Sequence, residues 1–225
     1  SIEYPDDFFS ILGGLNLNYN SKILDVGCGS GKFLFHLKEL KFRQLMGIDP
    51  HLDNEIITDT LIIKKKTLDQ LPNKQKFDLI LFSHSFEHMK DPLETLTKVR
   101  NILAEKGKCI IQMPVKTEYI WNKYGVDWVQ IDAPRHFFVY TINSFEILVK
   151  NAGLKLQKTV FDSTQFQFWG SEQYKRNIPL ESKNSYKNNP KKSIFTKEQI
   201  KKFENKSKEL NKKSLGDQAI FILEL

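Results

Sequence analysis

The stretch that decides the fold is LDVGCGSG, residues 24–31. An apolar run that carries Asp25 passes into a turn with glycines at 27, 29 and 31, and apolar residues then recur at helical spacing over residues 33–40. Glycine has no Cβ, so the backbone of such a turn can pass close to a ligand. The pattern predicts a strand, a nucleotide-cofactor turn at the carboxyl edge of a sheet, and a helix.

The turn departs from the dinucleotide fingerprint Gly-x-Gly-x-x-Gly, because Lys32 stands where the third glycine belongs. This weakens an NAD interpretation. Asp25 lies two residues before Gly27 and offers a carboxylate to a cationic group, which suits an amino-acid ammonium better than a diphosphate. The charge therefore favours S-adenosylmethionine. Asp49 follows a second apolar run at a spacing suited to ribose hydroxyls, a feature that NAD folds share.

Four blocks in order extend the pattern over about two thirds of the chain. They are LDVGCGSG at 24–31, GIDP at 47–50, FDLILFSHSFEHMKDP at 77–92 and KGKCIIQMP at 106–114. On these blocks the sequence resembles the class I, Rossmann-like S-adenosylmethionine-dependent methyltransferases, in the branch of ubiquinone-biosynthesis, glycan and small-molecule methyltransferases. The resemblance implies S-adenosylmethionine as cofactor.

Apolar strands alternate with helical patterns, which predicts an α/β fold with a mostly parallel sheet and helices on both faces. The resemblance implies a doubly wound seven-stranded sheet in the order 3-2-1-4-5-7-6, with the last strand antiparallel. We expect strands near residues 22–26, 45–49, 61–65, 77–82, 108–113, 154–161 and 219–225. We expect one methyltransferase domain over 1–225, with an aromatic substrate loop at 115–138 and a basic, partly helical insertion at 163–216 between strands six and seven.

The aromatic loop has no periodicity and leaves the carboxyl end of the fifth strand, where open α/β sheets bind ligands. Its rings, which include Tyr124 and Trp128, are expected to line a substrate pocket. The net charge of +7 is concentrated in residues 171–216, where thirteen Lys or Arg face five Glu. Such a run forms either a solvated face or lid, or a surface that attracts a phosphate-bearing substrate.

The chain has two cysteines without metal-ligand spacing, no stretch of membrane-spanning length and no leader of secretory type. We therefore expect a cytoplasmic protein without membrane contact, as a monomer or a homodimer.

The histidines carry the mechanistic information, because a hydroxyl acceptor must lose its proton to a base with a pKa near neutrality. His136 ends the aromatic loop and is the first candidate for the base. His84, just after the fourth strand, is the second. His88 is expected to orient a loop. The run from His84 to His88 also matches an inverted zinc-protease motif, but it follows a strand and soon reaches a helix start at Asp91. No metal is expected, although relatives with an acid and a histidine at Glu87 and His88 can hold a divalent ion.

The resemblance implies a role for each position of the cofactor site. Asp25, Gly27, Cys28 and Gly29 surround the methionine moiety, Asp49 holds the ribose hydroxyls, and backbone near Ser83 lies under the sulfonium. Pro50 belongs to the same cofactor-binding set. His88 completes the set of cofactor contacts. At the adenine, where relatives often carry an acid, this chain offers the Thr67 side chain and the Leu68 backbone.

These observations favour a methyltransferase that acts on a hydroxyl of a sugar, nucleotide sugar or related metabolite. One alternative is RNA methylation, with the lysine-rich segment and its Tyr174 and Tyr186 following the RNA backbone. The other is a non-catalytic binding module with the methyltransferase fold.

Overall fold

The computed structural model describes residues 6–225, and their side chains from Ser10 onward. The chain forms two compact units, which are described separately. The first comprises Ser1–Met113, Asn143–Thr159 and Ile220–Leu225, and the second comprises Pro114–Ile142 and Val160–Ala219. The second unit is thus formed mainly by the two segments that lie outside the predicted alternation of strands and helices.

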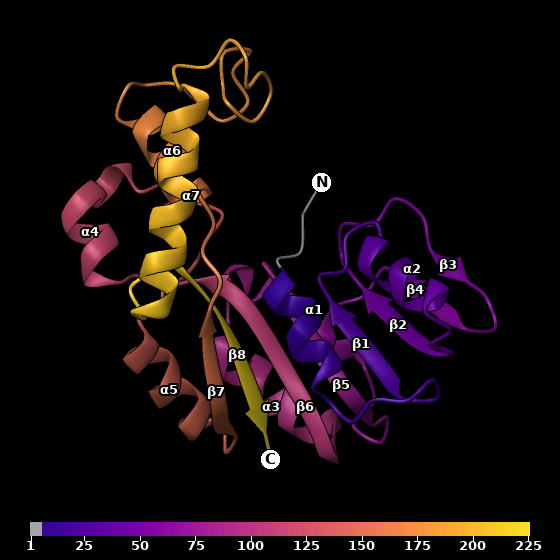
Figure 1. The fold of residues 1–225 in the computed structure, drawn as a ribbon. Coiled ribbons are helices and arrows are strands. Elements are labelled where there is room, and N and C mark those ends of the chain that lie inside the picture. Colours follow the sequence, from indigo (N-terminus) through magenta and orange to yellow (C-terminus); the bar gives the residue numbers. More distant parts are fainter. Residues whose placement is uncertain (1–5) are drawn as a thin grey trace. The chain divides into compact units, whose positions relative to one another are not determined.

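One sheet organises the first unit, in the order β3-β4-β2-β1-β5-β6-β8-β7 (Figure 1). Its strands are β1 (Lys22–Val26), β2 (Gln44–Ile48), β3 (Ile56–Ile57), β4 (Leu61–Lys64), β5 (Phe77–Ser83), β6 (Leu103–Pro114), β7 (Lys155–Phe161) and β8 (Gln218–Glu224). Apart from β3 this is the predicted order. The sheet has eight strands rather than seven, because two residues of β3 pair antiparallel with β4 and are too few to leave a period-2 pattern.

The centre of the sheet is parallel: β1 pairs with β2 and β5, and Asp25 lies opposite Gly47 and Leu81. The last strand is antiparallel, as predicted. The Val115 amide, past the end of β6, donates to the Asp217 carbonyl just before β8. Lys108 in the middle of β6 pairs with Glu224 at the end of β8. These two pairings fit only opposite strand directions.

Right-handed crossovers place α2 and α3 on opposite faces of the sheet, because β2 lies on one side of β1 and β6 lies beyond β5 on the other. Helix α2 begins after Gly31, whose φ of 75° favours a glycine. Asp91 stands at the N-cap of α3, with Pro92 in its first turn. The helical segments of this unit are α1 (Asp6–Gly13), α2 (Lys32–Glu39), η1 (Leu68–Gln70), η2 (Phe86–His88), α3 (Pro92–Ile102) and α5 (Ile142–Asn151).

A chain of buried rings anchors the loop after β5. The ring of Phe86 lies 5.6 Å from that of Phe82 and 5.6 Å from that of Phe145, and Phe145 lies 4.4 Å from Phe221. All four side chains are fully buried. Since Phe86 opens η2, this packing fixes the short segment that carries the candidate residues His84 and His88.

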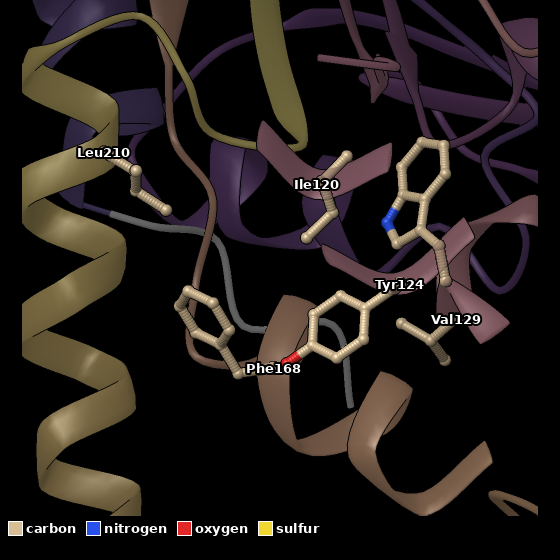
Figure 2. Packing of buried hydrophobic residues seen from close by; sticks show 6 residues of the cluster. Ile120, Tyr124, Val129, Phe168 and Leu210 are labelled. Carbon is tan, nitrogen blue, oxygen red and sulfur yellow. The ribbon is translucent and has the colours of Figure 1, made fainter. Parts of the chain in front are cut away.

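The second unit has its own hydrophobic core (Figure 2), formed by Ile120, Tyr124, Trp128, Val129, Phe168 and Leu210. Its elements are α4 (Glu118–Tyr124), η3 (Gly125–Asp127), η4 (Val129–Ile131), α6 (Phe166–Tyr174) and α7 (Lys197–Lys212). Trp128 is fully buried and Tyr124 is 4% exposed, so these two rings are core residues rather than exposed pocket walls. The sequence does not indicate that Tyr124 and Trp128 are buried, because each ring belongs to a separate short helical turn and no periodic pattern results.

Most lysines of α7 are paired within the helix. Glu204 binds Lys201 and Lys208, Glu209 binds Lys206 and Lys213, and Glu198 binds Lys202. The helix therefore presents much less net charge than its lysine count suggests. None of the helices in the described part of the chain combines the length and apolar character that a membrane crossing requires.

Candidate active site

The glycine turn after β1 adopts left-handed backbone angles that glycine reaches at low cost. Gly27, Gly29 and Gly31 have φ values of 76°, 51° and 75°. The amides of Gly27 and Cys28 both donate to the carbonyl of Ile48, at 2.8 and 3.2 Å, which fastens the turn to the end of β2. The turn is therefore preformed at the carboxyl edge of the sheet.

Two of these glycines serve different needs. A Cβ on Gly27 would lie 2.5 Å from the Cβ of Ser85, whereas a Cβ on Gly29 would meet nothing within 4 Å. Ser85 is buried and donates its hydroxyl to the Val26 carbonyl at 2.6 Å. Gly27 thus permits the loop after β5 to pack on the turn, and Gly29 borders open space.

Asp49 links the turn to the next strand end. Its Oδ2 accepts the Gly29 amide at 3.0 Å and its Oδ1 accepts the His51 amide at 2.8 Å. A carboxylate has about four lone-pair sites. Two backbone amides therefore leave it able to accept hydroxyl donors from a ligand.

Asp25 is 4% exposed, in the middle of the sheet's carboxyl end. Its pKa is raised to about 7, first because burial removes water from the carboxylate and second because the charge of Asp49 repels it. A buried acid close to neutrality is a frequent mark of a functional site.

Cys28 has a structural environment. A Cβ on Gly47 would lie 2.7 Å from the Cys28 Sγ, so the thiol packs against the bare backbone of β2. Burial, followed by the charges of Asp25 and Asp49, raises the pKa of this thiol to about 12. The thiol is protonated at neutral pH and is not a nucleophile.

The end of β5 is held by Gln112 of the neighbouring strand. Ser83 donates its hydroxyl to Gln112 Oε1 at 3.0 Å, and the amide of His84 donates to the Gln112 carbonyl at 2.9 Å. His84 has a φ of 52°, which is costly for a residue with a Cβ. Its Nδ1 lies 3.6 Å from Oε1 of the buried Glu87. Strain of this kind often accompanies function.

The remaining predicted cofactor residues lie in the segments that follow β2, β4 and β5 in the same unit. Thr67 precedes η1, where the Gln70 side chain accepts its amide at 3.0 Å. Leu68 is buried, whereas Pro50 and His88 are exposed. The described contacts assign no cofactor role to these four positions, which therefore remain predictions.

His136 belongs to the second unit and has a defined orientation. Its Nδ1 lies 2.9 Å from the Gln130 carbonyl, and a carbonyl only accepts, so Nδ1 carries the proton. The basic lone pair is then on Nε2, which lies 3.7 Å from Asp132 Oδ2. The His136 side chain is 9% exposed. Asp132 also pairs with Arg135 at 2.7 Å.

Asp217 supports the segment that positions His136. Its Oδ2 accepts Trp128 Nε1 at 2.8 Å and Gln130 Nε2 at 2.6 Å. Burial raises the pKa of Asp217, although these hydrogen bonds partly oppose the rise. The sequence reasoning missed Ser85, Gln112 and Asp217. In the sequence, the one sign that these residues have a role is that each is a polar residue within or next to an apolar strand.

Gly27 and Gly29 form a matched test of this geometry. Gly27→Ala is expected to lower the free energy of unfolding by about 2–5 kcal/mol, because left-handed strain of about 1–2 kcal/mol adds to a steric cost of about 1–3 kcal/mol against Ser85. Gly29→Ala carries the strain alone. Urea unfolding of both variants measures the difference, and equal losses would contradict the proposed contact with Ser85.

The raised pKa of Asp25 predicts a specific pH dependence of folding stability. From about pH 4 to 7 the unfolded carboxyl releases its proton while the folded one keeps it, so ionisation in the unfolded state progressively costs folding stability and the cost levels off above pH 7. The stability of Asp25→Asn relative to wild type should therefore rise over this range, by up to about 4 kcal/mol. Urea unfolding at several pH values of the ligand-free proteins measures it. Asp53→Asn, at an exposed acid, is the control; parallel curves for wild type and Asp25→Asn would refute the raised pKa.

Comparison with known proteins places the site in a family. Residues 3–159 match the methyltransferase domain family. The tRNA U34 carboxymethyltransferase of Campylobacter fetus is 30% identical over 105 residues, covering 42% of this chain and 37% of that protein. The enzyme of the same name from Campylobacter jejuni subsp. doylei is 25% identical over 146 residues, covering 59% and 49%. The chain thus spans about a third to a half of the length of these curated relatives.

Solved structures share the fold. The cyclopropane synthase MmaA2 from Mycobacterium tuberculosis superposes with a TM-score of 0.60 at 16% identity, over 96% of this chain and 82% of that one. The mycolic acid cyclopropane synthase CmaA1 complexed with SAH and CTAB gives 0.61 at 14% identity, over 97% and 83%. The chain belongs to the methyltransferase domain family, as a Rossmann-like methyltransferase whose cofactor is S-adenosylmethionine.

Proposed function

We propose that this methyltransferase acts on a hydroxyl oxygen of a small-molecule acceptor, with sugars and nucleotide-linked sugars as the acceptor class and His136 as the base. The observation that carries the proposal is the fixed tautomer of His136, whose Nδ1–H···O contact with Gln130 leaves Nε2 as the proton acceptor. A base is needed for an oxygen acceptor because the hydroxyl proton must leave as the new bond forms.

The residues of the first unit fit the cofactor. The open space at Gly29 allows a ligand to lie against the turn. Asp25 would pair with the ammonium group and Asp49 would accept the ribose hydroxyls, while Ser83 backbone would lie near the sulfur and Thr67 with Leu68 would hold the adenine. When bound, S-adenosylmethionine supplies a methyl group that its positive sulfur activates for displacement.

Because the methyl group is already activated, the protein needs to contribute little covalent catalysis. His136 Nε2 takes the hydroxyl proton, and the imidazolium that forms is stabilised by Asp132, whose Oδ2 lies 3.7 Å away. Asp217 forms buried hydrogen bonds with the side chains of Trp128 and Gln130. These bonds hold in place the Gln130 carbonyl, which orients the His136 ring. His84 is the second candidate for the base, and its left-handed backbone is the reason to keep it.

RNA methylation is a second candidate. It is supported by the tRNA-modifying relatives, whose match covers less than half of their length, and by the lysine-rich segment. The ion pairs along α7 reduce this support, because Glu204 and Glu209 each pair with two lysines and cancel one of the two positive charges that would otherwise face phosphates.

Replacement of His136 tests the base. His136→Asn keeps an amide N–H for the Gln130 carbonyl but removes the basic nitrogen at the Nε2 position. We expect kcat to fall by about 10²–10⁴-fold with unchanged S-adenosylmethionine affinity. The assay screens nucleotide sugars and free sugars for release of S-adenosylhomocysteine, then measures kcat with the accepted compound.

His36→Asn, at an exposed histidine of α2, is the matched control for this loss and should retain the wild-type rate. A wild-type rate in His136→Asn together with a strong loss in His84→Asn would transfer the role of base to His84.

The RNA candidate predicts a different result. A generic RNA would shift in a gel at low salt, and the affinity would fall steeply as salt is raised. If the RNA does not shift in the gel even at low salt, RNA methylation is excluded.

A further inference from the structure

A groove of about 450 Å³ in the second unit lies outside the site described above. Its walls include Tyr186, Pro190, Lys191, Phe195, Lys197 and Ile200. The volume falls within the range of about 300–1,000 Å³ that small ligands occupy. The groove thus combines aromatic rings, apolar groups and two cations in a space of ligand size.

The aromatic walls are held in place by the rings behind them. Tyr186 packs against Trp169 at 5.3 Å, and its ring lies edge-on to Phe195 at 6.2 Å. Phe195 in turn packs edge-on against Phe203 at 5.8 Å. Both groove rings are only half-buried. They therefore present rigid π surfaces to the groove at little entropic cost on binding.

The two lysines differ from most of those on α7. Among the described residues neither Lys191 nor Lys197 has an ion pair, and both are exposed. Lys197 is the first residue of α7, where the helix dipole already places positive charge. Lys191 also lines the groove, and the Glu198 carboxylate next to Lys197 is paired with Lys202, so within the described part of the chain the groove has two lysines without an ion-pair partner and its charge favours an anion such as a phosphate group.

We propose that this groove binds a nucleoside phosphate, with the base against Tyr186 and Phe195 and the phosphate at Lys191 and Lys197. This inference rests on the proposed function, because it takes the bound nucleotide to be the part of a nucleotide-linked sugar acceptor that does not react. The same chemistry is offered by a nucleotide of single-stranded RNA.

The groove and His136 belong to the same compact unit. Arg135, next to His136, interacts electrostatically with Glu181, and Glu181 pairs with Lys187, the neighbour of Tyr186. The charge of Glu181 acts on Arg135 through space only, so what links the candidate base with the groove is that both belong to the second unit. A nucleotide held there would belong to the same body that supplies the base.

The test is calorimetry of the full chain, saturated with S-adenosylhomocysteine so that nucleotides cannot enter the cofactor site. The probes are ADP, CDP, GDP, UDP, a ten-nucleotide single-stranded RNA and inorganic pyrophosphate. The groove variants are Lys191→Gln/Lys197→Gln, which changes only exposed side chains, and Phe195→Leu. Lys208→Gln/Lys213→Gln removes the same charge elsewhere along α7 and is the control.

We expect at least one nucleoside diphosphate to bind with a Kd that rises tenfold or more in both groove variants and less than twofold in the control. Binding of the RNA alone, with the same losses, supports the site and identifies RNA as the source of the nucleotide. Pyrophosphate binding as tight as the nucleotides, no binding by any probe, or equal losses in groove and control variants would overturn the inference. S-adenosylhomocysteine affinity is measured separately, so these failures leave the methyltransferase proposal unaffected.

Discussion

The hydrogen bond between the Gly29 amide and the Asp49 carboxylate is the contact on which the glycine turn of the first unit depends. It joins two strand ends that lie 20 residues apart in sequence. With the Ile48 carbonyl, which accepts the amides of Gly27 and Cys28, it keeps the turn in a conformation that only glycines adopt at low cost. The space beside Gly29 exists because this turn is fixed before any ligand arrives.

Buried carboxylates organise both units, but in opposite ways. Asp25 has its pKa raised by burial and by a neighbouring acid, so an incoming cation would supply the partner that favours its ionised form. Asp217 is also buried, yet it already accepts bonds from Trp128 and Gln130. One acid is therefore suited to respond to a ligand, and the other holds a loop in position.

Local patterns were predictable and long-range contacts were not. The glycine turn and the alternation of strands and helices follow from residues close in sequence, which is why the sequence predicts them, whereas the strand order was implied by the family resemblance. Trp128 was misread as a pocket wall because its partner, Asp217, lies 89 residues away. Ser85 and Gln112 were missed for the same reason: a single polar residue beside a strand has no period, and only the folded sheet shows which backbone it contacts.

The environment of Cys28 has a consequence for how the enzyme tolerates oxidants. With a pKa of about 12, roughly one thiol in 10⁵ is ionised at pH 7, and peroxides and alkylating agents attack the ionised form. A cysteine in the middle of a cofactor loop would otherwise be a weak point for oxidative inactivation. Here burial, followed by the charges of Asp25 and Asp49, keeps the thiol protonated, so peroxides and alkylating agents are expected to react with it slowly.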